Sequence, residues 1–220
     1  MTPTTRPETP ADREAVRRVN RLAFGRDDEA DLVDALRDGG FARVSLVAEV
    51  GGEVVGHILF SELPIRTDRG TVPALALAPL AVLPGYQRRG VGSALVRAGL
   101  EACRKAGHRI VLVLGHPGFY PRFGFSAKLA EPLASPFGGG EAWMALELAP
   151  GALAGVTGRA EYPPPFGGGP AGPAPGSGEQ TAVNKVNLRE KFALFGDHWN
   201  PRIVGELNGQ QVKLVKFRGE

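Results

Sequence analysis

A loop with two glycines and two arginines is the part of this sequence best suited to chemistry. Residues 80–92 read Leu-Ala-Val-Leu-Pro-Gly-Tyr-Gln-Arg-Arg-Gly-Val-Gly, and a helical pattern begins there. Gly90 and Gly92 lack a Cβ atom, so the backbone can approach a ligand closely and can adopt a positive φ angle. The first N–H groups of the helix have no partner within it, and the helix dipole is positive there. Together with Arg88 and Arg89, these features predict a site for a phosphate or pyrophosphate.

Two familiar glycine-rich motifs do not match this loop. The dinucleotide motif requires a third glycine where this chain has Leu95, and the P-loop requires Lys where it has Ser93. The pattern Gln/Arg-x-x-Gly-x-Gly/Ala between a strand and a helix matches in full, as Gln87-Arg88-Arg89-Gly90-Val91-Gly92. Here the chain resembles the GNAT superfamily of acetyl-CoA-dependent N-acetyltransferases, in which this loop holds the pyrophosphate of coenzyme A.

A second motif supports the resemblance. Tyr120-Pro-Arg-Phe-Gly-Phe125 resembles the Tyr-x-x-Leu/Phe-Gly-Phe that follows the fifth strand in many GNAT enzymes. For the first motif alone, an ordinary strand–helix connection with solvated arginines is an equal alternative. Two motifs in the family's order argue against that alternative.

The resemblance implies roles for individual residues. Tyr120 matches the tyrosine that protonates the departing thiolate in many GNAT enzymes, and a packed core aromatic residue is the alternative. Ser93 is expected to donate to a phosphate. The full set of predicted cofactor-binding residues is Leu80, Ala81, Val82, Gln87, Arg88, Arg89, Gly90, Val91, Gly92 and Ser93.

The general base is less clear. Many relatives place a glutamate on the fifth strand, whereas here that strand is Ile110-Val-Leu-Val-Leu114, without a carboxylate. His116 follows it and is the predicted base, with a cap of the Pro117 turn as the alternative. His57 or Glu62 could line the acceptor cleft, although a lone strand histidine is more often a satisfied core residue. An amine that is already neutral would need no base.

One predicted strand contains a break that bears on the site. Residues 72–83 are predicted to form one strand, and Pro79 within it cannot donate a ladder hydrogen bond, which suggests a bulge. In the GNAT fold the corresponding strand is bulged and splays from the next to admit the pantetheine arm. Backbone groups at residues 80–82 are then available to pair with a ligand amide.

Periodicity predicts the remaining elements and the fold class. The predicted elements are a helix capped by Thr9, a helix over 28–37, strands over 44–50, 53–61 and 72–83, a helix ending at Gly107, a strand over 110–114, a short helix or turn over 117–123, and a strand over 143–148. This order, with the resemblance, indicates an α/β fold. The expected architecture is a mixed, mainly antiparallel central sheet flanked by helices, the GNAT-like acyl-CoA N-acyltransferase fold.

The end of the chain differs in composition. Residues 163–178 contain twelve Gly or Pro in sixteen positions, which is typical of a linker. Asn208-Gly209 between two β-type runs then predicts a C-terminal hairpin over 202–217. This tail resembles the opening strands of a small single-domain cupin, but stops before the His-rich metal motif. The predicted domains are 1–162 (N-acetyltransferase), 163–180 (linker) and 181–220 (partial cupin-like segment).

Composition narrows the classes of partner. No apolar run approaches the ~18 residues of a membrane span, and the N-terminus lacks the apolar region of a secretory signal. The net charge of +3 includes no dense basic block, so no nucleic-acid partner is expected. The single Cys103 suits a reducing cytoplasm. Four histidines and one cysteine show no ligand spacing, so no metal is expected.

The leading interpretation is an N-acetyltransferase that moves an acetyl group directly from acetyl-CoA to an amine of a small molecule or a protein. One alternative is a catalytically silent coenzyme A-binding or regulatory module with an interaction tail, which the missing strand carboxylate favours and Tyr120 opposes. A metal-dependent cupin function in the tail is nearly excluded by the missing ligands. The acceptor is expected to be chosen by the first helices and by loops near 64–70 and 130–140. A homo-oligomer is compatible with the sequence.

Overall fold

The structure is a computed structural model that describes residues 3–167 and the backbone of residues 202–207 and 210–214. The chain divides into two compact units, Met1–Gly172 and Pro173–Glu220. In the second unit, β11 (Arg202–Leu207) pairs with β12 (Gln210–Leu214) in antiparallel orientation, which confirms the predicted hairpin strands over these residues. The predicted turn at 208–209, the extension to 217 and most of the predicted linker lie outside the described residues.

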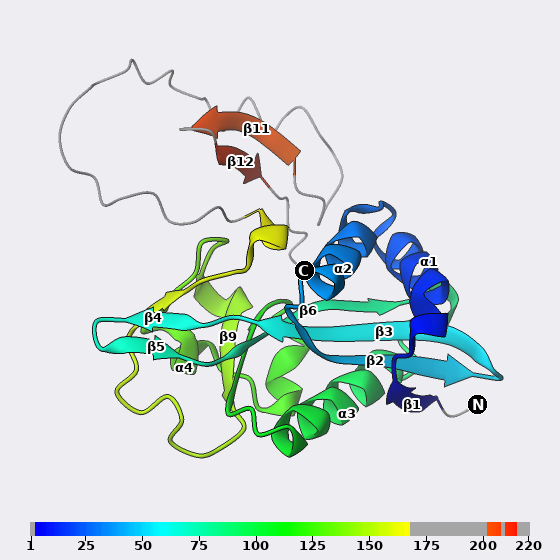
Figure 1. Ribbon diagram of the computed structural model, residues 1–220, viewed down its shortest axis with the longest axis horizontal. Coiled ribbons are helices and arrows are strands. Elements are labelled where there is room, and N and C mark those ends of the chain that lie inside the picture. Colours follow the sequence, from blue (N-terminus) through cyan, green and yellow to red (C-terminus); the bar gives the residue numbers. More distant parts are fainter. Residues whose placement is uncertain (1–2, 168–201, 208–209, 215–220) are drawn as a thin grey trace. The chain divides into compact units, whose positions relative to one another are not determined.

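A six-stranded sheet forms the centre of the first unit (Figure 1), in the order β1-β2-β3-β6-β7-β9. Only the β6–β7 pair is parallel, and the other neighbours are antiparallel. The strands are β1 (Thr4–Pro7), β2 (Ala42–Val50), β3 (Glu53–Glu62), β6 (Leu75–Val82), β7 (Ile110–Leu114) and β9 (Trp143–Glu147). This confirms the expected mixed, mainly antiparallel sheet. The first strand, β1, was not predicted.

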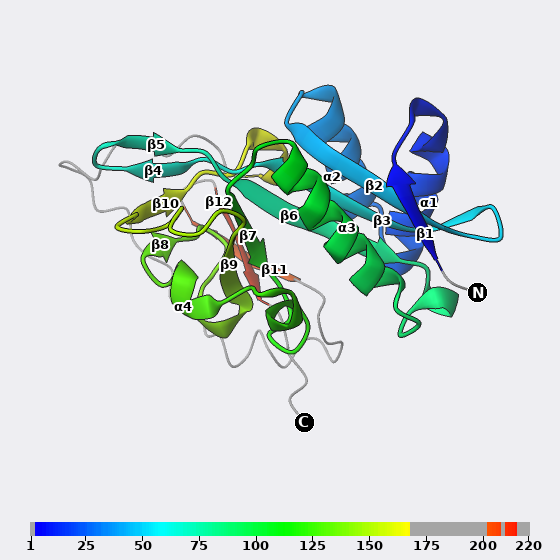
Figure 2. The ribbon, with the colours of Figure 1, turned by 90° about the horizontal axis from the view of Figure 1, so that it is seen from below.

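Helices cover both faces of this sheet, with α1 and α2 on one face and α3 on the other (Figures 1 and 2). Their bounds are α1 (Arg13–Phe24), α2 (Asp28–Asp38) and α3 (Val91–Lys105). The short helix before α1 is capped as predicted, because the Thr9 N–H donates to Asp12 Oδ2 at 2.8 Å. Helix α3 lies close to β3 because Gly99 has no side chain, and a Cβ there would lie 2.4 Å from Phe60.

A second, four-stranded sheet with the order β5-β4-β10-β8 was not predicted. Its strands are β4 (Ile65–Thr67), β5 (Gly70–Val72), β8 (Leu133–Ala134) and β10 (Gly158–Ala160). The prediction of one strand over 72–83 was wrong, because Val72 belongs to β5 and β6 begins only at Leu75. Between them, Pro73 has no N–H, and the Ala74 carbonyl accepts a bond of 2.9 Å from Leu63.

Short helices complete the first unit. They are α4 (Ala127–Ala130) and the 3₁₀ helices η1 (Pro10–Asp12), η2 (Pro84–Tyr86), η3 (Tyr120–Phe123), η4 (Gly140–Ala142) and η5 (Pro164–Phe166). Phe166 packs against the main core, and its ring centroid lies 4.8 Å from that of Tyr162. The described fold therefore includes the first residues of the predicted linker, which form η5. Within the described residues, no helix is both long enough and apolar enough to cross a membrane.

Candidate active site

A bulge shapes β6 at the predicted position. On the β3 side, Leu80 opposes Ile58 and Leu77 opposes Phe60. The two residues between them on β6 therefore face only one residue on β3, which is the count of a β-bulge. These two residues are Ala78 and Pro79, so the bulge predicted at Pro79 is confirmed.

The strands β6 and β7 separate beyond the bulge. They pair only at Leu75 with Val111 and at Ala76 with Leu112. The rest of β6 keeps its partner β3 on one side and has no β7 partner on the other. The predicted separation of neighbouring strands is therefore present between β6 and β7. It leaves backbone groups of β6 available to a ligand.

The orientation of the backbone selects which residues face this gap. The Leu83 N–H donates to the Val55 carbonyl at 2.9 Å, so Leu83 points toward β3. Because the backbone groups of successive strand residues point to opposite sides, Ala81 also faces β3, whereas Leu80 and Val82 face the gap. Ala81 was predicted to pair with a ligand together with them, and its backbone instead belongs to the β3 ladder.

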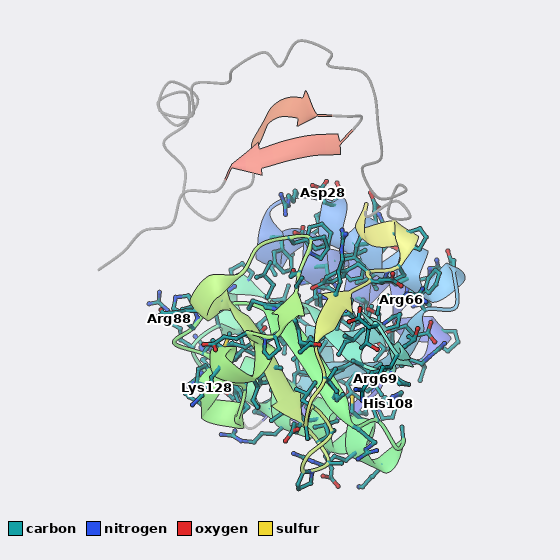
Figure 3. The ribbon with its side chains drawn as sticks, turned by 90° about the vertical axis from the view of Figure 1, so that its left-hand side faces the viewer. Asp28, Arg66, Arg69, Arg88, His108 and Lys128 are labelled. Atoms are coloured by element: carbon teal, nitrogen blue, oxygen red, sulfur yellow. The ribbon has the colours of Figure 1, made fainter. Side chains whose placement is uncertain are left out.

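The glycine–arginine loop connects β6 to α3 with two residues in the left-handed region. Arg88 has φ 59° and Gly90, the N-cap of α3, has φ 86°. For a non-glycine residue this conformation costs about 1–3 kcal/mol, and it concentrates at functional sites. Arg88 and Arg89 are exposed and have no carboxylate partner within residues 3–167. Figure 3 shows Arg88 at one side of the molecule, away from Arg66 and Arg69.

The side chain of Gln87 contacts the protein backbone. Its Nε2 donates to the Val82 carbonyl at 3.0 Å, so the side chain folds back onto the end of β6. This contact ties the loop to the strand whose backbone faces the gap. Gln87 therefore supports the loop in this structure, and its predicted contact with the cofactor remains a prediction.

The two sequence motifs meet at Gly92. A Cβ built on Gly92 would lie 3.7 Å from Val82, 3.7 Å from Phe119 and 3.9 Å from Leu80. The end of β6, the start of α3 and the residue before Tyr120 therefore converge on one half-buried glycine. A gap in the sheet that leads to a helix N-terminus with exposed arginines fits a chain-like ligand with a pyrophosphate, as coenzyme A has.

Tyr120 is packed among aromatic rings and is 8% exposed. Its ring makes edge contacts with Phe119 and Phe125, at centroid distances of 5.0 and 5.6 Å. Burial raises the pKa of the Tyr120 phenol, so the hydroxyl keeps its proton at neutral pH. The ring also lies on Gly115, where a Cβ would be 2.2 Å from Tyr120 Cε2. Sequence reasoning missed Gly115, although a glycine directly after a buried strand was visible.

The histidine predicted as base is exposed and closes a turn. His116 Nδ1 accepts a bond of 3.0 Å from the Gly118 N–H, which is the turn contact that the sequence offered as its alternative role. His57 is fully buried, and Glu62 forms an ion pair with Arg43. His57 therefore lies in the core, as the alternative for a lone strand histidine proposed.

A hollow of about 540 Å³ lies elsewhere on the unit, between α4, β8 and residues 138–141, and reaches Trp143. It contains none of the predicted site residues. Its lining includes Trp143 of β9 but no residue of β6, of α3 or of the loop between them. Within the described residues, no three His, Cys, Asp or Glu side chains gather to hold a metal ion.

Known proteins show the same combination of elements. The family model of the acetyltransferase (GNAT) domain matches residues 4–127. The Escherichia coli protein YhbS, named an uncharacterized N-acetyltransferase, is 37% identical over 159 residues, which are 71% of this chain and 94% of YhbS. A second such protein of Escherichia coli, YjhQ, is 43% identical over 130 residues, which are 58% of this chain and 69% of YjhQ.

Solved structures agree with these sequence matches. The crystal structure of Escherichia coli YhbS in complex with CoA superposes with a TM-score of 0.70 at 35% identity, covering 75% of this chain and 92% of YhbS. A GNAT acetyltransferase from Brucella melitensis in complex with acetyl-CoA gives a TM-score of 0.63 at 34% identity, covering 75% of this chain and 98% of that protein. With its bulged β6, its loop before α3 and these matches, the chain belongs to the GNAT family of N-acetyltransferases.

Proposed function

We propose that the gap beside β6, the loop Gln87–Ser93 and Tyr120 form the acetyl-transfer site of this enzyme. The reaction is the transfer of an acetyl group from acetyl-CoA, as in the family. The observation that supports this location is the convergence of Leu80, Val82 and Phe119 on Gly92. Two similar proteins were crystallised with CoA and with acetyl-CoA, which supports the same ligand here.

The residues divide into a binding set and a reacting set. The N–H groups of Gly90 to Ser93 and the charges of Arg88 and Arg89 would hold the pyrophosphate. Backbone groups of Leu80 and Val82 would bind the pantetheine amides and polarise the thioester carbonyl. Acetyl-CoA supplies the acetyl thioester. Tyr120 would then give its proton to the sulfur as the carbon–sulfur bond breaks and the new carbon–nitrogen bond forms.

The acceptor side of the site must bind an amine and accept its proton. The acceptor is an amine, and it must be neutral to attack the carbonyl carbon. His116 is the base that we propose for its proton, acting directly or through water. Five further statements stay predictions from the sequence: an acceptor amine on a small molecule or a protein, a homo-oligomer, a cytoplasmic location, a separate domain over 1–162, and a tail that resembles part of a cupin.

Two variants separate binding from chemistry. Tyr120→Phe removes only the phenolic proton donor, so we expect unchanged acetyl-CoA affinity by calorimetry and a fall in kcat of about 10²–10⁴-fold. Gly90→Glu places a negative side chain at the loop and should abolish acetyl-CoA binding. Gly40→Glu is the matched control, because Gly40 also has a positive φ, 72°, and open space around its Cβ position.

The assay would be thiol release from acetyl-CoA against a panel of amines, amino acids and peptides. Equal kcat for the parent and Tyr120→Phe, under conditions where chemistry limits the rate, would remove Tyr120 from the reacting set. Normal affinity in a folded Gly90→Glu variant would remove the loop from the binding set. Acetyl-CoA binding without turnover on any amine would instead favour the catalytically silent alternative.

A further inference from the structure

Two arginines from different elements lie over the same phenylalanine ring. The guanidinium carbon of Arg97, on α3, lies 5.4 Å from the Phe123 centroid. That of Arg122, on η3, lies 5.7 Å from Phe123 and 4.7 Å from Phe119. We call these four residues, Arg97, Phe119, Arg122 and Phe123, the arginine–phenylalanine cluster.

The ring contacts hold the guanidinium groups but do not neutralise them. A cation–π contact at an exposed site contributes about 0.5–1 kcal/mol and consumes no N–H donor. Both arginine side chains are exposed, and one further contact, from Arg122 Nε to the Phe119 carbonyl at 3.2 Å, orients Arg122. Each guanidinium keeps N–H groups in a planar fork that suits a phosphate.

The absence of carboxylate partners distinguishes this region. Of the seventeen arginines in residues 3–167, nine have an Asp or Glu partner and eight do not. Four of those eight belong to the loop before α3 (Arg88 and Arg89) or to the cluster (Arg97 and Arg122). Two arginines that the protein leaves without a carboxylate over one ring indicate an anionic ligand.

The arginine–phenylalanine cluster lies next to the end of the loop Gln87–Ser93. Phe119 lies 3.7 Å from the Cβ position of Gly92, and Arg97 is four residues after Ser93. Four residues correspond to about 6 Å along a helix axis, roughly one turn. A second anionic group carried close to the pyrophosphate would therefore reach the cluster, while the first is held at the loop.

We propose that Arg97 and Arg122 bind the 3′-phosphate of coenzyme A, an inference that rests on the proposed function. This phosphate is on the same ribose that carries the pyrophosphate, and it is a monoester with a charge near −2 at neutral pH. Charge-assisted bonds from two guanidinium groups suit it. The cluster would thus make the enzyme selective for coenzyme A thioesters over ligands that lack this phosphate.

The test compares CoA with 3′-dephospho-CoA by calorimetry on the full-length chain. The parent should bind CoA at least about tenfold more tightly, because a hydrogen bond to a charged group is typically worth a factor of this order. This ratio of dissociation constants should fall in Arg97→Gln and in Arg122→Gln, and should approach one in the double variant. The matched control is Arg69→Gln, an exposed arginine that also has no carboxylate partner within residues 3–167 and lies far from Arg88 in Figure 3.

This ratio of dissociation constants reports on the contact with the 3′-phosphate alone, because general damage to the site weakens the binding of CoA and of 3′-dephospho-CoA equally. The variants Arg97→Lys and Arg122→Lys keep the charge and should retain part of the ratio. A ratio near one in the parent, or a parent-like ratio in the double variant, would show that the arginines only pack on the rings. If the parent binds neither CoA nor 3′-dephospho-CoA, the proposed function itself fails, and this inference fails with it.

Discussion

A single small residue decides where the Tyr120 ring can lie. Gly115 follows β7 directly, and its N–H donates to the Ala142 carbonyl at 2.9 Å, so its backbone is held in place. A Cβ at this position would lie 2.2 Å from Cε2 and 2.7 Å from Cδ2 of Tyr120. The ring and a side chain at residue 115 cannot occupy the same space. Gly115 is therefore a positioning residue for the proposed acid.

We predict that Gly115→Ala lowers kcat through Tyr120. The ring must shift, so kcat should fall by about tenfold or more, whereas the dissociation constant of acetyl-CoA should change little. Overpacking of this kind costs about 1–3 kcal/mol, so the melting temperature should also fall. In the Tyr120→Phe background, the same change should reduce kcat little further, because the proton donor is already absent.

Gly85→Ala is the control for this prediction. Its Cβ would meet nothing within 4 Å and its φ lies outside the left-handed region, so kcat and melting temperature should stay at the parent's values. An unchanged kcat in Gly115→Ala would contradict the positioning role. A loss of kcat that is just as large in the Tyr120→Phe background would show that Gly115 acts through something other than the phenol.

At the scale of elements, a buried polar network joins the N-terminal segment, β2, β3 and α1. His57 Nδ1 lies 3.1 Å from Asn20 Nδ2, and His57 Nε2 lies 3.0 Å from Ser45 Oγ. The Asn20 amide nitrogen can only donate, so Nδ1 accepts and the His57 proton is on Nε2. Glu8 accepts from the Ser45 hydroxyl and pairs with Arg37 at 2.5 Å. These bonds form with His57 neutral, while the buried Asn20 Oδ1 has no hydrogen-bond partner among the described residues.

We predict that the first unit loses stability as the pH falls below about 6.5. Burial lowers the pKa of His57 from its ordinary 6.5, with Glu8 opposing, so the unfolded chain binds this proton more strongly than the folded one. Burial would raise the pKa of Glu8, but bonds from His57 and Ser45 outweigh it and lower that pKa below 4.5. Both shifts have the same sign, because protonation of either group favours unfolding.

The measurement is the free energy of unfolding at several values between about pH 7.5 and pH 5.5. The decline should be smaller in His57→Gln, which has no group to protonate. His108 is the comparison, because burial and Arg43 also lower its pKa although it is more accessible. His108→Gln should therefore remove less of the decline than His57→Gln does. A parent whose stability is flat across this range would contradict the prediction.

The elements that the sequence predicted are those with enough residues to show a period. Helix α3 and strands β3 and β7 carry long apolar patterns, and Pro79 revealed the bulge through its missing N–H group. Strands of two to four residues show no period, which is why β1 and the second sheet were missed. The parallel pairing of Gly158 with Leu133 also joins residues far apart in sequence, which no local pattern indicates.

The part of the candidate site that a contiguous motif forms could be predicted from the sequence. Contacts between residues far apart in the sequence could not. Glycines and arginines within one loop predicted the anion site before α3. The backbone of Ala81 could not be assigned to β3 without the register of β6. Arg97 and Arg122 are twenty-five positions apart in the sequence, and only the fold places both over Phe123.

At the scale of the whole molecule, the described core of the first unit is formed by residues that precede the second unit in the sequence. Two clusters of buried hydrophobic residues account for the interior of residues 3–167. Tyr162 is half-buried and is the last residue that packs against the second cluster, and its ring also contacts Phe137 at 4.8 Å. Phe166 is likewise half-buried and is the last residue that packs against the first cluster. The described packing therefore continues through Phe166, a few residues beyond the predicted limit of 162.

We predict that a chain ending at Gly167 keeps the melting temperature, the acetyl-CoA affinity and the kcat of the full chain, because every described core contact is retained. A chain ending at Ala160 loses the half-buried rings of Tyr162 and Phe166. Full burial of a large apolar side chain contributes about 1.5–3 kcal/mol, so the loss of two partly buried rings should lower the melting temperature. The two truncations differ by seven residues, which makes each the control for the other. If the Gly167 truncation instead loses stability, affinity and turnover together, the second unit contributes to the working structure of the enzyme.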